Sequence, residues 1–251
     1  SSTDTTVSKT IWKVNLYGIR VSNGTYLFED DNKTKQKYGV DYFHLKADSI
    51  QVLVEEIEFN GDSIGLKLNN LSLIEQSGFY LTELTAKTKI YPGTINFKQL
   101  RIVTGKSIIR GSYSMQAPNF SNYLNYNQKV EMVANLKSST LAVEDLMYFV
   151  PQLRGIENSI FIHGKVRGTV ANLKCNDLQL IIDNDNSVEG DFSFKGLPEI
   201  ENTFIYADVK QLKTSAEGLR KIPVLPFESG NTLTIPASFS QLEDIRFAGN
   251  F

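Results

Sequence analysis

Polar and apolar residues alternate from Thr94 to Met115, and their spacing predicts a β-hairpin with an irregularity in its first strand. The first apolar run contains Ile95 and Phe97 and, after a slip of one residue, Leu100 and Ile102. A slip of this kind is typical of a β-bulge, which adds one residue to a strand. The segment 104–107 contains a glycine and predicts a tight turn. The second alternating run contains Ile109, Gly111, Tyr113 and Met115.

The same order of strand, slip, strand and turn recurs at least three more times. One copy contains Val14, Leu16, Ile19 and Val21, with an expected turn at 22–25 and a further run at 26–28. A second contains Ile50, Val52, Val54, Ile57 and Phe59, with an expected turn at 60–63. A third contains Leu173, Cys175, Leu178, Leu180 and Ile182, with an expected turn at 183–187. The copies lie roughly 40 residues or a multiple of that distance apart, which is typical of repeat proteins.

A few segments depart from the β pattern. The segment 118–127 is rich in asparagine and tyrosine and predicts a loop. A helical insert is expected at 141–157, because Leu146, Phe149 and Val150 have helical spacing and Pro151 ends the pattern. Shorter inserts are expected near 215–222, where Ser215 is a plausible cap, and near 237–244. These segments divide the chain into a β-repeat region at 1–140, the insert at 141–157 and a continuing β-repeat region at 158–251.

The last residues repeat the pattern of an earlier strand. Ile245, Phe247, Gly249 and Phe251 match the alternation that begins at Ile160, and the chain then stops. We therefore expect the sequence to be truncated at its C-terminus and to come from a longer repeat protein.

Composition narrows the partners that the chain is expected to bind. The 251 residues are 41% hydrophobic, enough to bury a core, and they carry a formal net charge of −2. Without a basic excess, charge gives no support to a nucleic-acid or anionic-membrane partner. No apolar run is long enough to form a transmembrane helix.

The candidate chemistry is sparse, and we expect no catalytic site, metal or cofactor. His44 and His163 are isolated histidines, and Cys175 occupies an apolar position of an expected strand, which is typical of a small core residue. The segment 183–187 resembles the start of a calcium loop. The loop's glycine and final glutamate are replaced, however, by Val188 and Phe194.

The expected strands offer one apolar face and almost no helix to cover it. An apolar face must be buried against something, and each 100 Å² left in water costs about 2.5 kcal/mol. Three arrangements achieve this: two sheets packed as a sandwich, a closed barrel, or one sheet curled into a trough that apolar ligand fills. Composition alone favours the sandwich. The open-ended repeat and the slips, which let a sheet bend, favour the trough.

Several segments resemble the translocation and assembly module family, the TamB-like and AsmA-related proteins of diderm bacteria. The most specific are 71–79, LSLIEQSGF; 141–151, ending at Pro151; 162–173, IHGKVRGTVANL; and 190–204, GDFSFKGLPEIENTF. The resemblance extends over most of the chain. It implies an all-β fold, an elongated, curled antiparallel sheet of β-taco or β-groove repeats with a few short helical inserts.

The resemblance also implies a function. The chain would be a segment of a periplasmic protein, anchored in the inner membrane, whose apolar groove conducts or shields phospholipid or assists outer-membrane protein assembly. Its partners would be phospholipid acyl chains and, through parts of the protein outside this sequence, an outer-membrane assembly partner. The candidate groove-lining residues are Ile95, Phe97, Leu100, Ile102, Ile109, Tyr113, Met115, Val130, Met132, Leu136, Ile160, Ile162, Val166, Leu178, Leu180, Ile182, Phe192, Phe194, Ile205 and Val209.

Two other functions remain open from the sequence. One is a structural or adhesive β-sandwich array that packs its own core and binds protein or glycan. The other is a parallel β-helix of the kind found in carbohydrate enzymes, which the lack of clustered acids at the turns disfavours.

Overall fold

The computed structural model describes residues 15–225, 227 and 230–250. All strands in this part of the chain belong to one antiparallel sheet. Its twelve strands pair in chain order, each with the strands before and after it. The strands are β1 (Asn15–Glu29), β2 (His44–Asn60), β3 (Ser63–Glu75), β4 (Tyr80–Tyr91), β5 (Thr94–Thr104), β6 (Ile108–Gln116), β7 (Glu131–Ala142), β8 (Ser159–Thr169), β9 (Asn172–Ile182), β10 (Asn186–Lys195), β11 (Phe204–Thr214) and β12 (Ile245–Asn250). The expectation of an all-β antiparallel sheet is confirmed.

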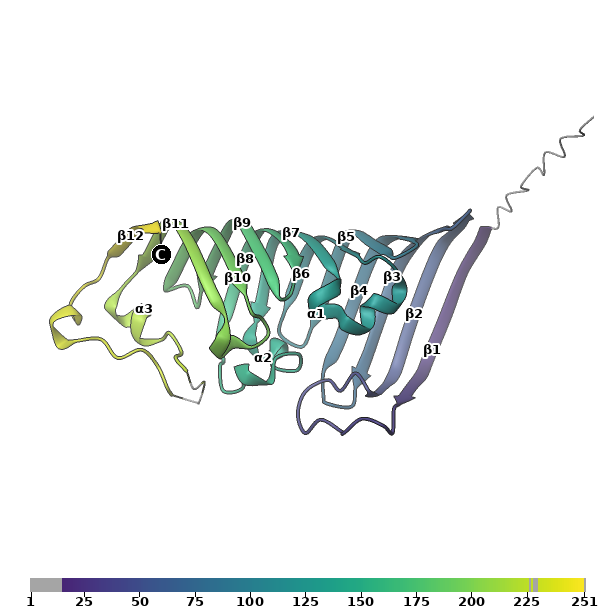
Figure 1. Cartoon of the computed structure of the whole chain (residues 1–251), viewed down its shortest axis with the longest axis horizontal. Helices are drawn as coiled ribbons and strands as arrows, with labels where there is room; N and C mark the ends of the chain where they lie inside the picture. The colour runs from purple at the N-terminus through teal and green to yellow at the C-terminus, as the bar shows by residue number, and fades with distance from the viewer. Residues whose placement is uncertain (1–14, 226, 228–229, 251) are drawn as a thin grey trace, which may run out of the picture.

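The sheet is open, because β1 and β12 do not pair with each other in the described part of the chain. The strands follow one another along the long axis of the molecule, and the sheet curves rather than lying flat (Figure 1). The helices are short: α1 (Tyr126–Lys129), α2 (Val143–Leu146), α3 (Ala216–Arg220) and the 3₁₀ turns η1 (Phe120–Asn125), η2 (Pro151–Leu153), η3 (Ile200–Asn202) and η4 (Ala237–Phe239). Among the described residues, no helix has the length and apolar character needed to cross a membrane.

The predicted slips are sites of irregular pairing. The register of β5 and β6 shifts between Phe97 and Leu100, and Gln99 there has a φ of 52°. The register of β9 and β10 shifts in the same way, next to Asp177 with a φ of 49°. The slips of β1 and β2 face each other, with Leu16 opposite Ile57, so this pair keeps its register from Asn15 to Val21 and shifts it only near Gly24. Bulges bend strands and increase their twist, which is consistent with the curvature of the sheet.

Leucine or valine alternates with glycine along a line that crosses the sheet from β5 to β12. Neighbouring strands contribute one residue each to this line, which we name the central row. Its members are Leu100, Gly111, Leu136, Gly164, Leu178, Gly190, Val209 and Gly249.

The glycines of the central row are required by close contact with neighbouring strands. A Cβ on Gly111 would lie 2.0 Å from the carbonyl oxygen of Asn135, and a Cβ on Gly190 would lie 2.3 Å from that of Asp208. Gly111 also has a φ of 149°, which other residues rarely adopt. Because the glycines leave room, the larger side chains beside them are buried: Leu100 is 8% exposed, and Leu178 is 4% exposed.

Three expectations about local structure need correction. No turn forms at 22–25, because β1 continues to Glu29 and only shifts its register near Gly24, where Asn23 adopts a φ of 54°. The segment 118–127 is not an irregular loop, since Asn119 accepts a hydrogen bond from Asn122 N and starts the helical turns η1 and α1. At 237–244 only the short turn η4 is helical. Val14 of the first repeat copy lies outside the described residues.

The helical insert between β7 and β8 is shorter than expected, but it binds the turn between β5 and β6. Asp145 accepts hydrogen bonds from the hydroxyl groups of Thr104 and Ser107 and, at 3.1 Å, from Lys106 N. Thr104 and Ser107 are buried. The carboxylate of Asp145 therefore satisfies polar groups that the turn would otherwise bury unpaired.

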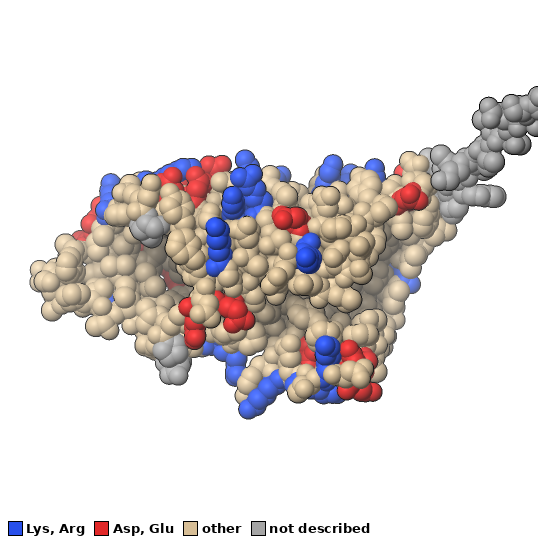
Figure 2. All heavy atoms as spheres, viewed as in Figure 1, with Lys and Arg blue, Asp and Glu red and all other residues tan. Residues whose placement is uncertain are grey.

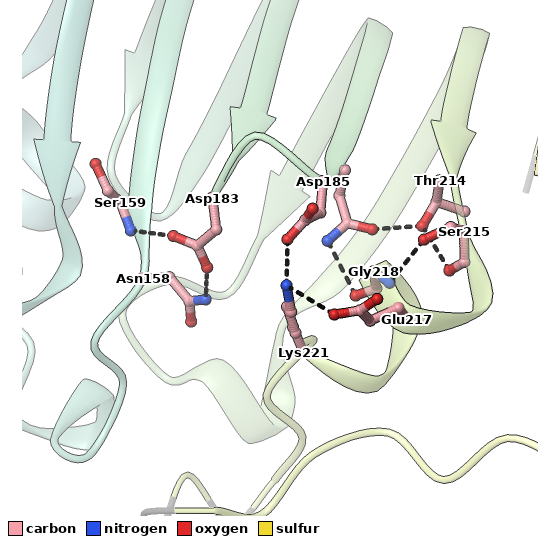
Figure 3. Close-up of polar contacts among 10 residues, drawn as sticks. Asn158, Ser159, Asp183, Asp185, Thr214, Ser215, Glu217, Gly218 and Lys221 are labelled. Carbon is pink, nitrogen blue, oxygen red and sulfur yellow. Dashed lines mark hydrogen bonds and ion pairs between the residues drawn. The ribbon is translucent and has the colours of Figure 1, made fainter. Parts of the chain in front are cut away.

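The insert after β11 binds the turn between β9 and β10 in a similar way (Figure 3). Asn186 Nδ2 donates to the carbonyl oxygen of Gly218 at 3.1 Å, and the Asn186 amide oxygen accepts from the Thr214 hydroxyl. Lys221 Nζ lies 2.6 Å from a carboxylate oxygen of Asp185. The cap predicted at Ser215 is confirmed, because its hydroxyl accepts a hydrogen bond from Gly218 N at 3.0 Å.

Candidate functional site

Strand pairing places every candidate groove-lining residue from β5 to β11 on one face of the sheet. Residues directly opposite each other on paired strands project from the same face. Ile95 is opposite Met115, and Met115 is opposite Met132. The same relation connects Ile102 with Ile109; Leu136 with Gly164; Ile160 with Ile182; Ile162 with Leu180; Val166 with Cys175; Phe192 with Ala207; and Phe194 with Ile205. We name this the apolar face, and Val130 lies directly before β7 at its edge.

The apolar face continues across β1 to β4, which the candidate list omitted. Ile90 of β4 is opposite Ile95 of β5 and Ile64 of β3. The further apolar members include Leu16, Ile19, Val21, Tyr26 and Phe28 of β1; Val52, Val54 and Ile57 of β2; Leu66, Leu68, Leu71 and Leu73 of β3; and Leu81, Leu84 and Ala86 of β4. The alternation of these residues was visible in the sequence and could have extended the list.

Much of the apolar face is in contact with solvent. Val130 is fully buried, and Val209 and Cys175 are almost so. Most other candidates are half-buried, including Phe97, Val166 and Leu180. At the two ends of the sheet the face is more open, with Ile205 53% exposed in β11 and Ile19 49% exposed in β1. Such a contiguous apolar surface is unusual in a monomer and is typical of a binding site.

A cavity of about 760 Å³ lies between residues from opposite ends of the strands. One wall comes from the end of β1 and the β1–β2 loop, with Phe28, Tyr42 and Phe43, and the other comes from Tyr123 to Asn127 of η1 and α1. Figure 2 shows this recess between the helical segment and the loop. The described residues that line it include one carboxylate, Asp30, and no lysine or arginine.

Tyrosines attach the η1–α1 wall to the apolar face. The Tyr123 hydroxyl lies 3.1 Å from the carbonyl oxygens of both Gly93 and Met115. Tyr126 hydrogen-bonds with the hydroxyl of Tyr113, and its hydroxyl lies 3.2 Å from the sulfur of Met132. Burial and the hydrogen bond with Tyr126 raise the pKa of Tyr113 far above its ordinary value. These phenols therefore stay neutral and fix the wall in position.

Tyr42 on the opposite wall lies in the electrostatic field of a buried carboxylate, Glu75. Burial, Tyr126 and Glu75 all raise the pKa of Tyr42, although the residue as a whole remains 60% exposed to solvent. Glu75 is 3% exposed and accepts a hydrogen bond from Ser77 N at 2.8 Å through one oxygen. Its other oxygen, Oε1, has no hydrogen-bond partner among the described residues.

The polar residues near the β1–β2 loop form structural contacts. His44 is buried, and its Nδ1 lies 3.0 Å from Asp41 Oδ2. Burial opposes the charge of Asp41, but hydrogen bonds from Gln36 N and Phe43 N and from His44 hold the pKa of Asp41 below its ordinary value. The Ser77 hydroxyl donates a hydrogen bond to the carboxylate of Glu75.

Other candidate chemistry from the sequence also has structural partners. Asp183 accepts hydrogen bonds from Ser159 N at 2.8 Å and from the Asn158 amide (Figure 3). The described residues contain no group of three or more potential metal ligands. Cys175 is buried on the apolar face as predicted, and this burial raises the pKa of its thiol to about 11.

Comparison of the chain with models of protein families, with curated proteins and with solved structures found no match.

Proposed function

We propose that the apolar face binds the acyl chains of phospholipids and that the curved sheet forms a groove which conducts or shields them. The observation that carries this proposal is the uncovered apolar face. The described strands form one sheet, and the short helices leave most of that face without a second protein layer. Acyl chains would bury it with a gain of about 25 cal/mol for each Å² removed from water.

The cavity supports the same proposal. Its two walls come from opposite ends of the strands, as expected where a sheet curls around a ligand. Its lining combines large aromatic rings with a few polar groups, the composition typical of sites that bind the boundary between an apolar chain and a polar head. A groove for amphiphiles therefore accounts for both the open face and the recess.

The resemblance to the translocation and assembly module family agrees with this function. On this proposal the chain is a segment of a periplasmic protein that carries phospholipid between the inner and outer membranes or assists outer-membrane protein assembly.

Native mass spectrometry on Val166→Asp tests the proposal. Val166 is half-buried on the apolar face, between Ala134 of β7 and Cys175 of β9. A carboxylate there is costly among acyl chains, and we expect the variant to stay folded but to lose most of its co-purified lipid. Solvent extraction of the same preparation would identify the lipid that the unsubstituted protein carries.

Lys165→Asp is the matched control. Lys165 is the next residue along β8, and its exposed side chain projects from the opposite face. The Lys165→Asp variant should therefore keep both its bound lipid and its thermal stability. Normal lipid loading in Val166→Asp would contradict the proposal, as would the absence of lipid from the unsubstituted protein when it is expressed with membranes present.

The alternative function, a structural or adhesive β-sandwich array that binds protein or glycan, predicts a different result. In that fold Val166 would lie in a packed core, and the aspartate would unfold the domain with a loss of several kcal/mol. Thermal unfolding of Val166→Asp therefore separates the two functions.

A further inference from the structure

Arginine and lysine residues form a row on the face of the sheet opposite the apolar face. Arg101 of β5 is directly opposite Arg110 of β6, and Arg110 is directly opposite Lys137 of β7. Each of them follows or precedes a member of the apolar face in its strand, so their side chains project to the other side. Arg110 and Lys137 are exposed. We name these three residues the basic row.

Other basic residues on this face also lie directly opposite a residue of the same charge on the neighbouring strand. Lys87 is opposite both Lys67 and Lys98, and Arg167 is opposite Lys174. Directly opposed like charges destabilise a sheet. Among the ion pairs of the described residues, Arg101 has Glu83 as a partner, whereas neither Arg110 nor Lys137 takes part in one. The basic row is therefore a local patch of positive charge in a chain of formal net charge −2, and the same face carries opposed carboxylates further along the sheet, where Asp191 of β10 faces Asp208 of β11.

An apolar row runs beside the basic row on the same face. Val103 of β5 is opposite Ile108 of β6, and Phe161 of β8 is opposite Ile181 of β9, with Thr140 of β7 between these two pairs. Their side chains are only partly buried, and Ile181 is 37% exposed. If only water covered this face, polar residues would be expected at these positions.

We propose that these two rows bind an acidic, amphipathic segment of a protein partner. The partner's carboxylates would contact the basic row, and its apolar side chains would cover Val103, Ile108, Phe161 and Ile181. Both rows cross the strands and so run along the sheet. The apolar row extends about 19 Å from β5 to β9, which corresponds to an amphipathic helix of about 13 residues, and the basic row lies beside its β5–β7 part over about 10 Å. This surface does not depend on lipid binding at the apolar face.

The chemistry of the surface favours protein over other anionic partners. An apolar strip flanked by charge is typical of protein interfaces. Half-buried side chains on a sheet do not protrude far enough to enter a bilayer, as a membrane-binding helix face does. Phe161 is the single aromatic residue of the two rows, whereas single-stranded nucleic acid is bound by several stacked aromatic rings.

Fluorescence anisotropy with two synthetic peptides tests the proposal. The first is a helical peptide of about 14 residues with glutamate along one side and leucine along the other, and the second has the same composition in scrambled order. We expect the first to bind with a Kd in the micromolar range and to weaken at least about tenfold when salt rises from about 50 to 300 mM. The scrambled peptide should bind at least about fivefold more weakly.

Variants assign the binding to the two rows. The double substitution of Arg110→Glu and Lys137→Glu should weaken binding of the amphipathic peptide at least about tenfold, and Phe161→Ser should weaken it about fivefold. Arg167→Glu with Lys174→Glu makes the same change in charge elsewhere on the face and should weaken binding less than about threefold. Arg110→Glu alone replaces two repulsive pairs with attractive ones, so its melting temperature should not fall.

Three results of the peptide measurements would overturn the proposal. They are absence of peptide binding at low salt, equal binding of the scrambled peptide, and equal losses in the two double variants. Tighter binding of phosphatidylglycerol vesicles or of a single-stranded oligonucleotide through Arg110 and Lys137 would assign the surface to a different partner and would also contradict it.

Discussion

Gly111 is the residue where local geometry most strictly limits the sequence. It combines a φ of 149° with a backbone carbonyl only 2.0 Å from the position of a Cβ. We expect Gly111→Ala to lower the free energy of unfolding by about 2–4 kcal/mol, because β6 and β7 must separate or change register to admit the methyl group. Urea denaturation followed by circular dichroism measures this loss.

Gly65→Ala is the control for that substitution. Gly65 lies in β3, and no atom outside its chain neighbours comes within 4 Å of its Cβ position. Alanine there should leave the unfolding midpoint nearly unchanged or raise it slightly. Equal losses at positions 111 and 65 would show that the central row does not need its glycines.

At the scale of elements, the helical inserts contact and stabilise the turns between strands. The insert that contains α2 reaches the β5–β6 turn through Asp145, and Val40 N of the β1–β2 loop donates to Tyr148 O of the same insert at 2.7 Å. Phe79 of the β3–β4 turn packs edge-on against Phe149, with ring centroids 4.9 Å apart. A single insert therefore connects three turns that are separate in the sequence.

Asp145→Ala should destabilise this end of the sheet. The substitution leaves the buried hydroxyl groups of Thr104 and Ser107 without their acceptor, which is expected to cost about 2–4 kcal/mol. Differential scanning fluorimetry should show a lower melting temperature, and hydrogen exchange should rise first in the turn at 104–107. Glu144→Gln removes only an ion pair with the largely exposed Lys106 and should cost less than about 1 kcal/mol. A larger effect from Glu144→Gln than from Asp145→Ala would contradict this role.

The sequence predicted the strands and bulges well because both depend on local alternation. The slips at Phe97 and Cys175 mark real register shifts, since a bulge moves every later apolar residue by one position. The prediction of a turn at 22–25 was wrong because a bulge, which forms at Asn23 and Gly24, favours the same residue types as a turn.

Features that depend on distant contacts were not predictable in this way. The role of Asp145 depends on a turn about 40 positions earlier in the chain, and the basic row arises only when β5, β6 and β7 are in register. The cavity likewise requires the β1–β2 loop and α1 to face each other.

At the scale of the whole molecule, the open sheet predicts an elongated particle. Eleven intervals between twelve strands give a sheet about 53 Å long at the usual strand spacing. We expect small-angle X-ray scattering to give a radius of gyration above about 20 Å, compared with about 18 Å for a compact domain of this length. A value near 18 Å would contradict an elongated sheet in solution.

The central claim is that lipid lies against the apolar face, and site-specific photocrosslinking tests it most directly. A photoreactive amino acid is placed in turn at Val166 and Lys165, neighbours that project from opposite faces of β8, in cells with labelled phospholipid. We predict that lipid will crosslink to position 166 at least about fivefold more than to position 165. Equal crosslinking at the two positions, or none at position 166 in a folded protein, would contradict the account.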